Sequence, residues 1–296
     1  MIIKQTHTVS MEIEAQHFVD YIANHFPVVS SRNGAKKAIK RGELLLNGEI
    51  VETGTWIKGG EQILFVDPQV NPPKPYKLDL DVVYEDDSIA IINKPPGIEV
   101  SGNKFKTIEN ALSVNLQVSN ELDALPWARP VHRLDYPTSG LLLVAKTKSA
   151  QISLGRQFEK KKIHKRYRAV VIGELPEKGE MRTPVNGLAS SSDFSLVKIV
   201  DSLKSIKLSL VDLFPHTGRT HQLRVHLADL GFPILGDSLY GKEGMILKSK
   251  GMFLAAVEIR FIHPKTEKFF KLDIEQPAKF TTYLEREARR FLNYNT

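Results

Sequence analysis

A proline-rich stretch divides this 296-residue chain. Residues 68–77 read PQVNPPKPYK, and the four prolines in these ten positions resist both helix and sheet. We predict a linker here, between a small first unit at residues 11–67 and a larger second unit at residues 78–296. The length of the chain also suggests two domains rather than one.

The first unit carries helix and hairpin signals together with a cationic face. Apolar residues recur four apart in residues 15–26, which predicts a helix with one buried side. A serine at position 30 or 31 can cap a second helix, which Gly42 ends. Asn47-Gly48 predicts a tight hairpin. The basic residues of the second helix form one face: Arg32, Lys36, Lys37, Lys40 and Arg41. This face suits contacts to an anionic backbone, without base readout.

Strand patterns outnumber helix patterns in the second unit. Strands are predicted at 140–146, 166–173, 205–214 and 253–263, and helices at 107–116, 149–161, 220–230 and 279–292. Strands and helices do not alternate regularly, as they would in a doubly wound parallel sheet. We therefore predict an α+β fold with a mixed, mostly antiparallel central sheet.

Composition favours an anionic partner. The net charge is +7 and the pI about 9.3, which suits nucleic acid, although many basic proteins bind nothing anionic. The absence of cysteine excludes disulfides, thiolate nucleophiles and Cys-ligated metal centres. The opening residues lack a secretory pattern, and no apolar run is long enough to span a membrane. We expect a cytoplasmic protein.

Residues 130–147 contain the strongest candidate for chemistry. His-Arg-Leu-Asp stands in a turn-rich segment just before an apolar strand. Asp135, between a cation and a turn, could serve as a nucleophile or base that its neighbours keep anionic. Alternatively, Asp135 only caps a turn and pairs with Arg133.

A second candidate segment spans residues 214–231, where a strand, a glycine-containing turn and a helix follow one another. Arg224 lies beside the apolar stripe of this helix, so it should be partly buried and should have an acidic partner. Arg219 precedes the helix, where anions are favoured. Alternatively, both are ordinary surface arginines.

Basic residues also crowd positions 156–168, RQFEKKKIHKRYR. With Tyr167 among them they suit phosphate contacts and base stacking, or form a solvated helix face. His216, His221 and His226 are five apart, so on a helix successive side chains diverge by about 140° and do not share one metal ion. Motifs for nucleotide hydrolysis, dinucleotide binding and serine hydrolysis are absent.

The sequence resembles the large-subunit-type (RluA-like) pseudouridine synthases. The resemblance begins with His132–Asp135 and the following Thr138–Leu141. Four further segments agree in the family's order: NKPPGIEV at 93–100, KRYRAVVIGE at 165–174, GRTHQLRVH at 218–226 and GDSLYG at 236–241. Residues 15–66 resemble an S4 RNA-binding domain, through SSRNGAKKAIKRG and LLLNG.

This resemblance implies a fold and a reaction. The fold would be a central mixed sheet with a cleft, preceded by a small α-L-like S4 module. The reaction would convert uridine to pseudouridine within structured RNA, with no cofactor and no metal. Ribosomal RNA of the large subunit would be the first substrate to test and transfer RNA the second. A monomer is expected.

The resemblance also implies roles for residues. Asp135 would be the catalytic aspartate, Tyr167 would pack against the target base, and Arg224 would pair with the aspartate. Arg133 would help hold the RNA open, and Arg219 and His221 would contact RNA.

Two adjacent positions depart from the family pattern, since Tyr136-Pro137 replace a pair that is often charged. This departure puts the local contacts to RNA and the choice of target site in doubt. Two alternatives stay open: a catalytically inactive ribosome-assembly factor that binds RNA, and an Asp-dependent hydrolase, which leaves the first unit unexplained.

Overall fold

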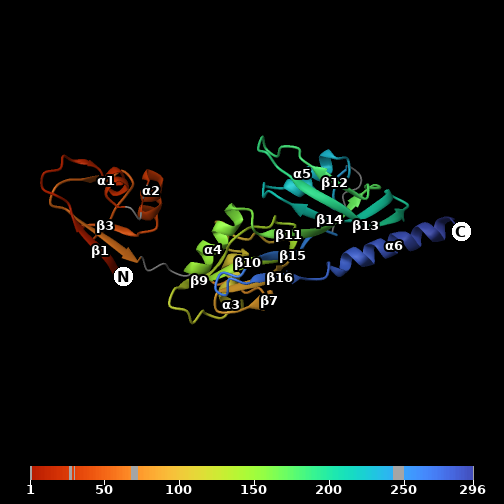
Figure 1. The fold of residues 1–296 in the computed structure, drawn as a ribbon, viewed down its shortest axis with the longest axis horizontal. Coiled ribbons are helices and arrows are strands. Elements are labelled where there is room, and N and C mark those ends of the chain that lie inside the picture. Colours follow the sequence, from red (N-terminus) through yellow and green to blue (C-terminus); the bar gives the residue numbers. More distant parts are fainter. Residues whose placement is uncertain (1, 27–28, 30, 68–72, 243–249, 296) are drawn as a thin grey trace. The chain divides into compact units, whose positions relative to one another are not determined.

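The computed structural model divides the chain into two compact units, Met1–Pro72 and Pro73–Thr296 (Figure 1). It describes residues 2–26, 29, 31–67, 73–242 and 250–295. The first part of the predicted linker, residues 68–72, lies outside the described residues, whereas residues 73–77 are grouped with the second unit.

The described residues of the first unit form two helices and a four-stranded sheet in the order β1-β6-β3-β4. Its elements are β1 (Ile2–Thr8), β2 (Gln16–His17), α1 (Phe18–His25), α2 (Arg32–Lys40), β3 (Leu44–Leu46), β4 (Glu49–Ile50), β5 (Trp56–Ile57) and β6 (Gln62–Asp67). Ser31 caps α2 by accepting a hydrogen bond from the Gly34 amide at 3.0 Å. Asn47 and Gly48 both have positive φ and form the predicted turn.

This unit starts earlier than residue 11, the position from which the sequence analysis began it. β1 pairs antiparallel with β6 and adds an edge strand to the sheet. The predicted helix at 15–26 is also shorter, because Gln16 and His17 pair with β5 before α1 begins. Phe18 and Ile22, the four-apart residues, are fully buried against Ala35 and Leu44.

The second unit is built on a ten-stranded sheet. Its strands are β7 (Asp81–Glu85), β8 (Ile89–Lys94), β9 (Ala124–Pro130), β10 (Ser139–Thr147), β11 (His164–Ile172), β12 (Lys178–Met181), β13 (Ser192–Ser202), β14 (Ile206–Pro215), β15 (Leu254–Ile262) and β16 (Phe269–Asp273). Its helices are α3 (Ile108–Asn115), α4 (Lys148–Glu159), α5 (Gln222–Asp229) and α6 (Ala278–Asn295). The main order is β12-β13-β14-β11-β15-β10-β8-β7, with β9 paired to β10 and β16 to β15.

Helices pack on both faces of this sheet. All nine residues of β10 are buried, and they alternate between two cores. Leu142 and Val144 face the core shared with α3 and α5, whereas Leu141 and Leu143 face the core shared with α4. Burial on both sides explains the continuous apolar run in the sequence. The predicted α+β class with a mixed sheet is confirmed. No described helix has the length and hydropathy to cross a membrane.

One parallel pairing joins the two halves of the sheet. β10 runs parallel to β15 through Ser139 and Gly140, whereas the other named strand pairs of this sheet are antiparallel. Gly140 has φ +109°, and a Cβ atom there would lie 2.1 Å from the carbonyl oxygen of Ala256. Only glycine permits this approach of the two backbones. The joint lies directly after the segment that carries Asp135.

Candidate active site

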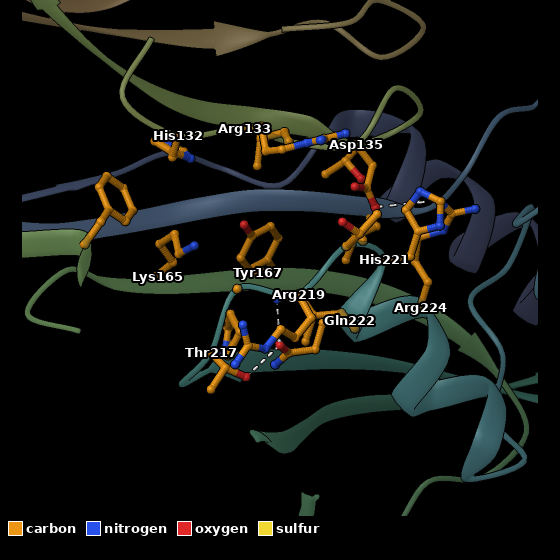
Figure 2. Close-up of a pocket in the computed structure, with 18 of the residues that line it drawn as sticks. His132, Arg133, Asp135, Lys165, Tyr167, Thr217, Arg219, His221, Gln222 and Arg224 are labelled. Atoms are coloured by element: carbon orange, nitrogen blue, oxygen red, sulfur yellow. Dashed lines mark hydrogen bonds and ion pairs between the residues drawn. The ribbon is translucent and has the colours of Figure 1, made fainter. Parts of the chain in front are cut away.

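A cavity of about 290 Å³ opens where three segments of the second unit converge (Figure 2). The segment between β9 and β10 contributes residues 131–135 and Thr138. β11 contributes Lys165 and Tyr167, and the turn and first residues of α5 contribute residues 217–224. The two halves of the sheet therefore both supply walls of the cavity.

At one end of the cavity Asp135 lies beside Arg224, whose side chain is held in place by Asp237. The Arg224 side chain is 2% exposed, and its Nη1 lies 3.6 Å from Oδ2 of Asp135. Arg224 also donates to both oxygens of Asp237, from Nε at 2.7 Å and from Nη2 at 2.8 Å. This two-point contact fixes the plane of the guanidinium, so Asp135 meets a positive charge that does not need to reorganise. Among the described residues, no ion pair joins Asp135 to Arg133.

Asp237 is the acidic partner that burial of Arg224 requires. Burial opposes ionisation of Asp237, but the hydrogen bonds and charge of Arg224, together with the amides of Leu239 and Tyr240, hold the pKa of the carboxyl below its usual value. The amides of Leu239 and Tyr240 donate to the same carboxylate at 2.9 and 3.1 Å. Sequence reasoning did not single out Asp237, although it lies in the GDSLYG segment.

A second buried cation, Lys94, lies near Asp135. Its side chain is fully buried, and its Nζ donates to the carbonyl oxygens of Pro95 and Ile98, both at 2.9 Å. Burial lowers the pKa of Lys94 to about 8, and the charge of Asp135 opposes this shift. Lys94 belongs to the NKPPGIEV segment, whose sequence did not predict the contacts of this lysine.

Tyr167 forms the middle of the cavity wall. It is 7% exposed and lies on β11, opposite Leu213 of β14. Burial raises the pKa of its phenol, and the charge of Asp135 raises it further. The hydroxyl is therefore protonated at neutral pH, so it can donate a proton or a hydrogen bond to a bound group.

His132 and Lys165 lie at the other end of the cavity (Figure 2). Nε2 of His132 accepts the Leu143 amide at 3.0 Å, and burial, with Lys165 nearby, lowers the pKa of His132 to about 3. The ring is therefore neutral with its proton on Nδ1. Nδ1 is buried and has no hydrogen-bond partner among the described residues, and the same holds for Oγ1 of Thr138.

The start of α5 is held rigidly over the cavity. Oε1 of Gln222 accepts the Thr217 hydroxyl at 2.7 Å and the Arg219 amide at 3.0 Å. Nε2 of Gln222 donates to Ser192 at 2.8 Å. His221 has φ +58°, and its Nδ1 lies 3.0 Å from the Tyr240 hydroxyl. Left-handed backbone at a non-glycine residue is a strained feature that often accompanies a functional site.

Six of the predicted site residues line this cavity: Arg133, Asp135, Tyr167, Arg219, His221 and Arg224. The other five lie in the first unit and are exposed: Arg32, Lys36, Lys37, Lys40 and Arg41. Two of these five already have acidic neighbours, since Arg32 pairs with Asp20 at 2.7 Å and Arg41 pairs with Glu43.

The three evenly spaced histidines have separate partners. His216 pairs with Asp193 at 2.7 Å, His221 contacts Tyr240, and Nδ1 of His226 lies 3.1 Å from Ser192 Oγ. Within the described part of the chain, no cluster of three or more His, Cys, Asp or Glu side chains is arranged to hold a metal ion.

Comparison with known proteins identifies the class. Residues 88–229 match the model of the RNA pseudouridylate synthase family. An RNA pseudouridine synthase of Aquifex aeolicus (strain VF5) is 30% identical over 91% of this chain and 93% of its own length. Ribosomal large subunit pseudouridine synthase D of Xylella fastidiosa (strain Temecula1 / ATCC 700964) is 34% identical over 84% of this chain and 82% of its own.

The solved structure of human RNA pseudouridylate synthase domain containing 1 matches with a TM-score of 0.57 at 25% identity. The match covers 69% of this chain and 86% of the human one. The chain belongs to the RNA pseudouridylate synthase family. It is an RluA-like RNA pseudouridine synthase, an isomerase, as its sequence motifs predicted.

Proposed function

We propose that Asp135 is the catalytic aspartate of this enzyme, and that Arg224 orients it. The observation that carries the proposal is the contact of 3.6 Å between Asp135 and an arginine that Asp237 immobilises, inside a cavity walled by Tyr167. A nucleophile or base held by a fixed charge needs little reorganisation during the reaction.

The target uridine is hidden in folded RNA, so it is extruded into the cavity before it reacts. Its base packs against Tyr167, and Asp135 then attacks C1′ of the ribose or C6 of the base, or begins an elimination. The base detaches, rotates and rejoins the ribose through C5. Uridine and pseudouridine have the same atoms, so the reaction needs neither an oxidant nor a second substrate. The protonated Tyr167 hydroxyl can donate to the base while it is detached.

The remaining predicted residues bind RNA in this scheme. Arg133 is exposed at the cavity rim, where it holds open the duplex from which the uridine is withdrawn. Arg219 and His221 contact the RNA at the opposite rim, which the turn before α5 forms.

The first unit is proposed to be an S4-like RNA-binding domain. The lysines on α2, Lys36, Lys37 and Lys40, are exposed and suit backbone phosphates. Structured RNA is the substrate class, with large-subunit ribosomal RNA first because two kinds of relatives carry that substrate in their names. Transfer RNA is second. The proposal also includes a cytoplasmic location, where both RNAs function, and the monomeric state that the family resemblance implies.

Release of tritium from RNA labelled at uridine C5 tests this proposal. Pseudouridine formation replaces the C5–H bond with a C–C bond, so the tritium passes to water. Unmodified ribosomal RNA and then transfer RNA are incubated with the wild type, with Asp135→Ala and with Asp135→Asn. We expect release by the wild type alone, while all three proteins bind RNA with similar affinity.

Two outcomes contradict this scheme in different ways. Turnover by Asp135→Ala would refute the aspartate assignment. Binding without release by the wild type, on both RNAs, would favour a ribosome-assembly factor that has lost its chemistry.

A further inference from the structure

A second cavity of about 510 Å³ adjoins the first. The two share one wall, which consists of Phe158, Lys165, Pro215, Thr217, Gly218 and Arg219. Beyond this wall the second cavity is lined by the end of α4, the start of β11 and His216. Its volume lies within the range of small-molecule sites. None of the roles proposed above uses it.

The shared wall carries two cations without counter-ions. Among the described residues, no acidic side chain pairs with Lys165 or Arg219, although many other basic residues of this unit have such partners. Lys165 and Tyr167 are two apart on β11, so both side chains project from the same face of the strand. Figure 2 shows Lys165 beyond Tyr167, on the side away from Arg224.

Lys165 differs from an ordinary surface lysine. It is partly buried, and its Nζ lies 5.7 Å from the centre of the Phe158 ring. Burial lowers its pKa, with no acidic residue to oppose the shift. A partly desolvated ammonium is costly unless an anion completes its environment. In contrast, Lys160, Lys161 and Lys162 nearby are exposed, so water solvates their charges.

RNA supplies an anion at the required place. Consecutive nucleotides are joined by one phosphodiester, so a chain that occupies both cavities must carry that phosphate across the shared wall. We propose that the second cavity binds the nucleotide next to the target uridine, and that Lys165 and Arg219 bind the phosphate linking the two. This inference rests on the proposed function, because it requires the uridine to occupy the first cavity.

Arg219 is suited to the outer side of this phosphate. The residue is exposed, but the hydrogen bond from its amide to Gln222 fixes the turn that carries it. Lys165 approaches from β11 on the other side. Two cations from separate elements hold a phosphate that is positioned between the cavities, and this contact fixes where the neighbouring nucleotide lies.

Single methylphosphonate linkages test the phosphate contact, because they remove one charge from the RNA without changing its bases. The substrate is the shortest RNA fragment that the wild type modifies, with the neutral linkage placed 5′ of the target, 3′ of it, or three nucleotides away. Each RNA is tested against the wild type, Lys165→Met and Lys165→Arg. Lys204→Met is the matched control, since Lys204 lies in the turn between β13 and β14 and lines neither cavity.

With the wild type, we expect one of the two flanking neutral linkages to lower affinity and turnover by about tenfold or more. Lys165→Met should show a similar loss on unmodified RNA, and the neutral linkage should then add less than about twofold, because the same contact is already missing. Lys165→Arg should retain most of the activity, and Lys204→Met should behave as the wild type. The inference would be overturned if the losses from Lys165→Met and from the neutral linkage multiplied when the two were combined. It would also be overturned if neither flanking linkage had an effect on the wild type.

An abasic ribose at the neighbouring position tests occupancy of the second cavity. We expect it to raise KM for the wild type and to leave kcat within about twofold, because the lost contact is made equally in substrate and transition state. An unchanged KM for abasic RNA on both sides of the target would show that no neighbouring base enters. The wild type's turnover of intact RNA tests the proposed function separately, and affinity is measured in every case, so the two failures are distinguishable.

Discussion

The two ends of the active-site cavity differ in how their charges are balanced. At one end Arg224 contacts two carboxylates, and Lys94 is satisfied by backbone carbonyls. At the other end Lys165 has no counter-ion and Nδ1 of His132 has no partner among the described residues. The first end is complete before RNA arrives, whereas the second is completed by its ligand. The protein thus separates groups that must be fixed for chemistry from groups that gain their partners on binding.

Removal of the charge on Asp135 should have the largest effect. We expect Asp135→Asn to lower turnover by at least about 10³-fold, because an amide neither attacks nor accepts a proton. RNA affinity should stay within about twofold, since Lys165 and His132 at the other end of the cavity are unchanged. Tritium release and a filter-binding titration measure the two quantities. Comparable losses of turnover and of RNA affinity would show that chemistry and RNA binding are not confined to separate ends of the cavity.

Disruption of the Arg224–Asp237 pair should have the next largest effect. Asp237→Asn leaves a buried guanidinium without its main counter-ion, which costs about 3–5 kcal/mol of the free energy of unfolding. Urea denaturation measures this change. Glu180→Gln is the matched control, because it removes the carboxylate from the exposed pair with Arg182 and should cost at most about 1 kcal/mol. Equal losses of unfolding free energy in the two variants would mean that burial does not preorganise the Arg224–Asp237 pair.

Because His132 is neutral in the folded protein, the free energy of unfolding should depend on pH. The folded pKa, about 3, lies below the unfolded value of about 6.5, so protonation favours the unfolded chain. The contribution is fully present above pH 6.5 and is lost as the pH falls towards 3. Because the ring is only partly buried, we expect a loss of about 2 kcal/mol between pH 7 and pH 4.

His132→Gln is the comparison for this pH effect, since its Oε1 can still accept the Leu143 amide. Both proteins contain the same carboxylates, so the pH dependence caused by these groups cancels in the difference between the two unfolding free energies. This difference should shrink by the same amount as the pH falls. A constant difference would mean that His132 does not change its protonation state between pH 7 and pH 4.

The smallest effect concerns Lys161, at the edge of the second cavity. It follows α4 with φ +54°, a conformation that glycine adopts without strain. Lys161→Gly should raise the free energy of unfolding by about 0.5–1 kcal/mol and weaken RNA binding severalfold. Lys161→Ala should weaken binding equally without the gain in stability. Unchanged affinity in both variants would remove Lys161 from the RNA-binding surface.

The sequence predicted the main elements of the second unit because their patterns are dictated by burial. β10 is apolar throughout, since both of its faces are covered, and α5 shows its stripe through Leu223 and Leu227. β9 was missed because two prolines in ALPWARP suggest a turn, although this strand pairs with β10. Short edge strands such as β12 carry no strong pattern of their own.

The site was predictable as a set of residue types but not as an arrangement. The motifs contain Asp135, Tyr167 and Arg224, which the structure brings to one cavity, whereas their roles are still predictions. Asp237 was not identified as the partner of Arg224, because that contact is set by how the chain returns after α5. Within the described part of the chain, Lys165 has no counter-ion and Nδ1 of His132 has no hydrogen-bond partner, which is likewise a property of three-dimensional packing that no local pattern contains.

The parallel pairing of β10 with β15 at Gly140 affects the order in which the parts of the active site form during synthesis. Asp135 belongs to the half of the sheet that contains β8 and β10, whereas Tyr167 and Arg224 belong to the half that contains β11 and β14. Among the described residues, the backbones of the halves pair where Ser139 and Gly140 lie beside Ala255 and Ala256 of β15, a strand near the end of the chain. A growing polypeptide therefore synthesises its aspartate long before it can use it.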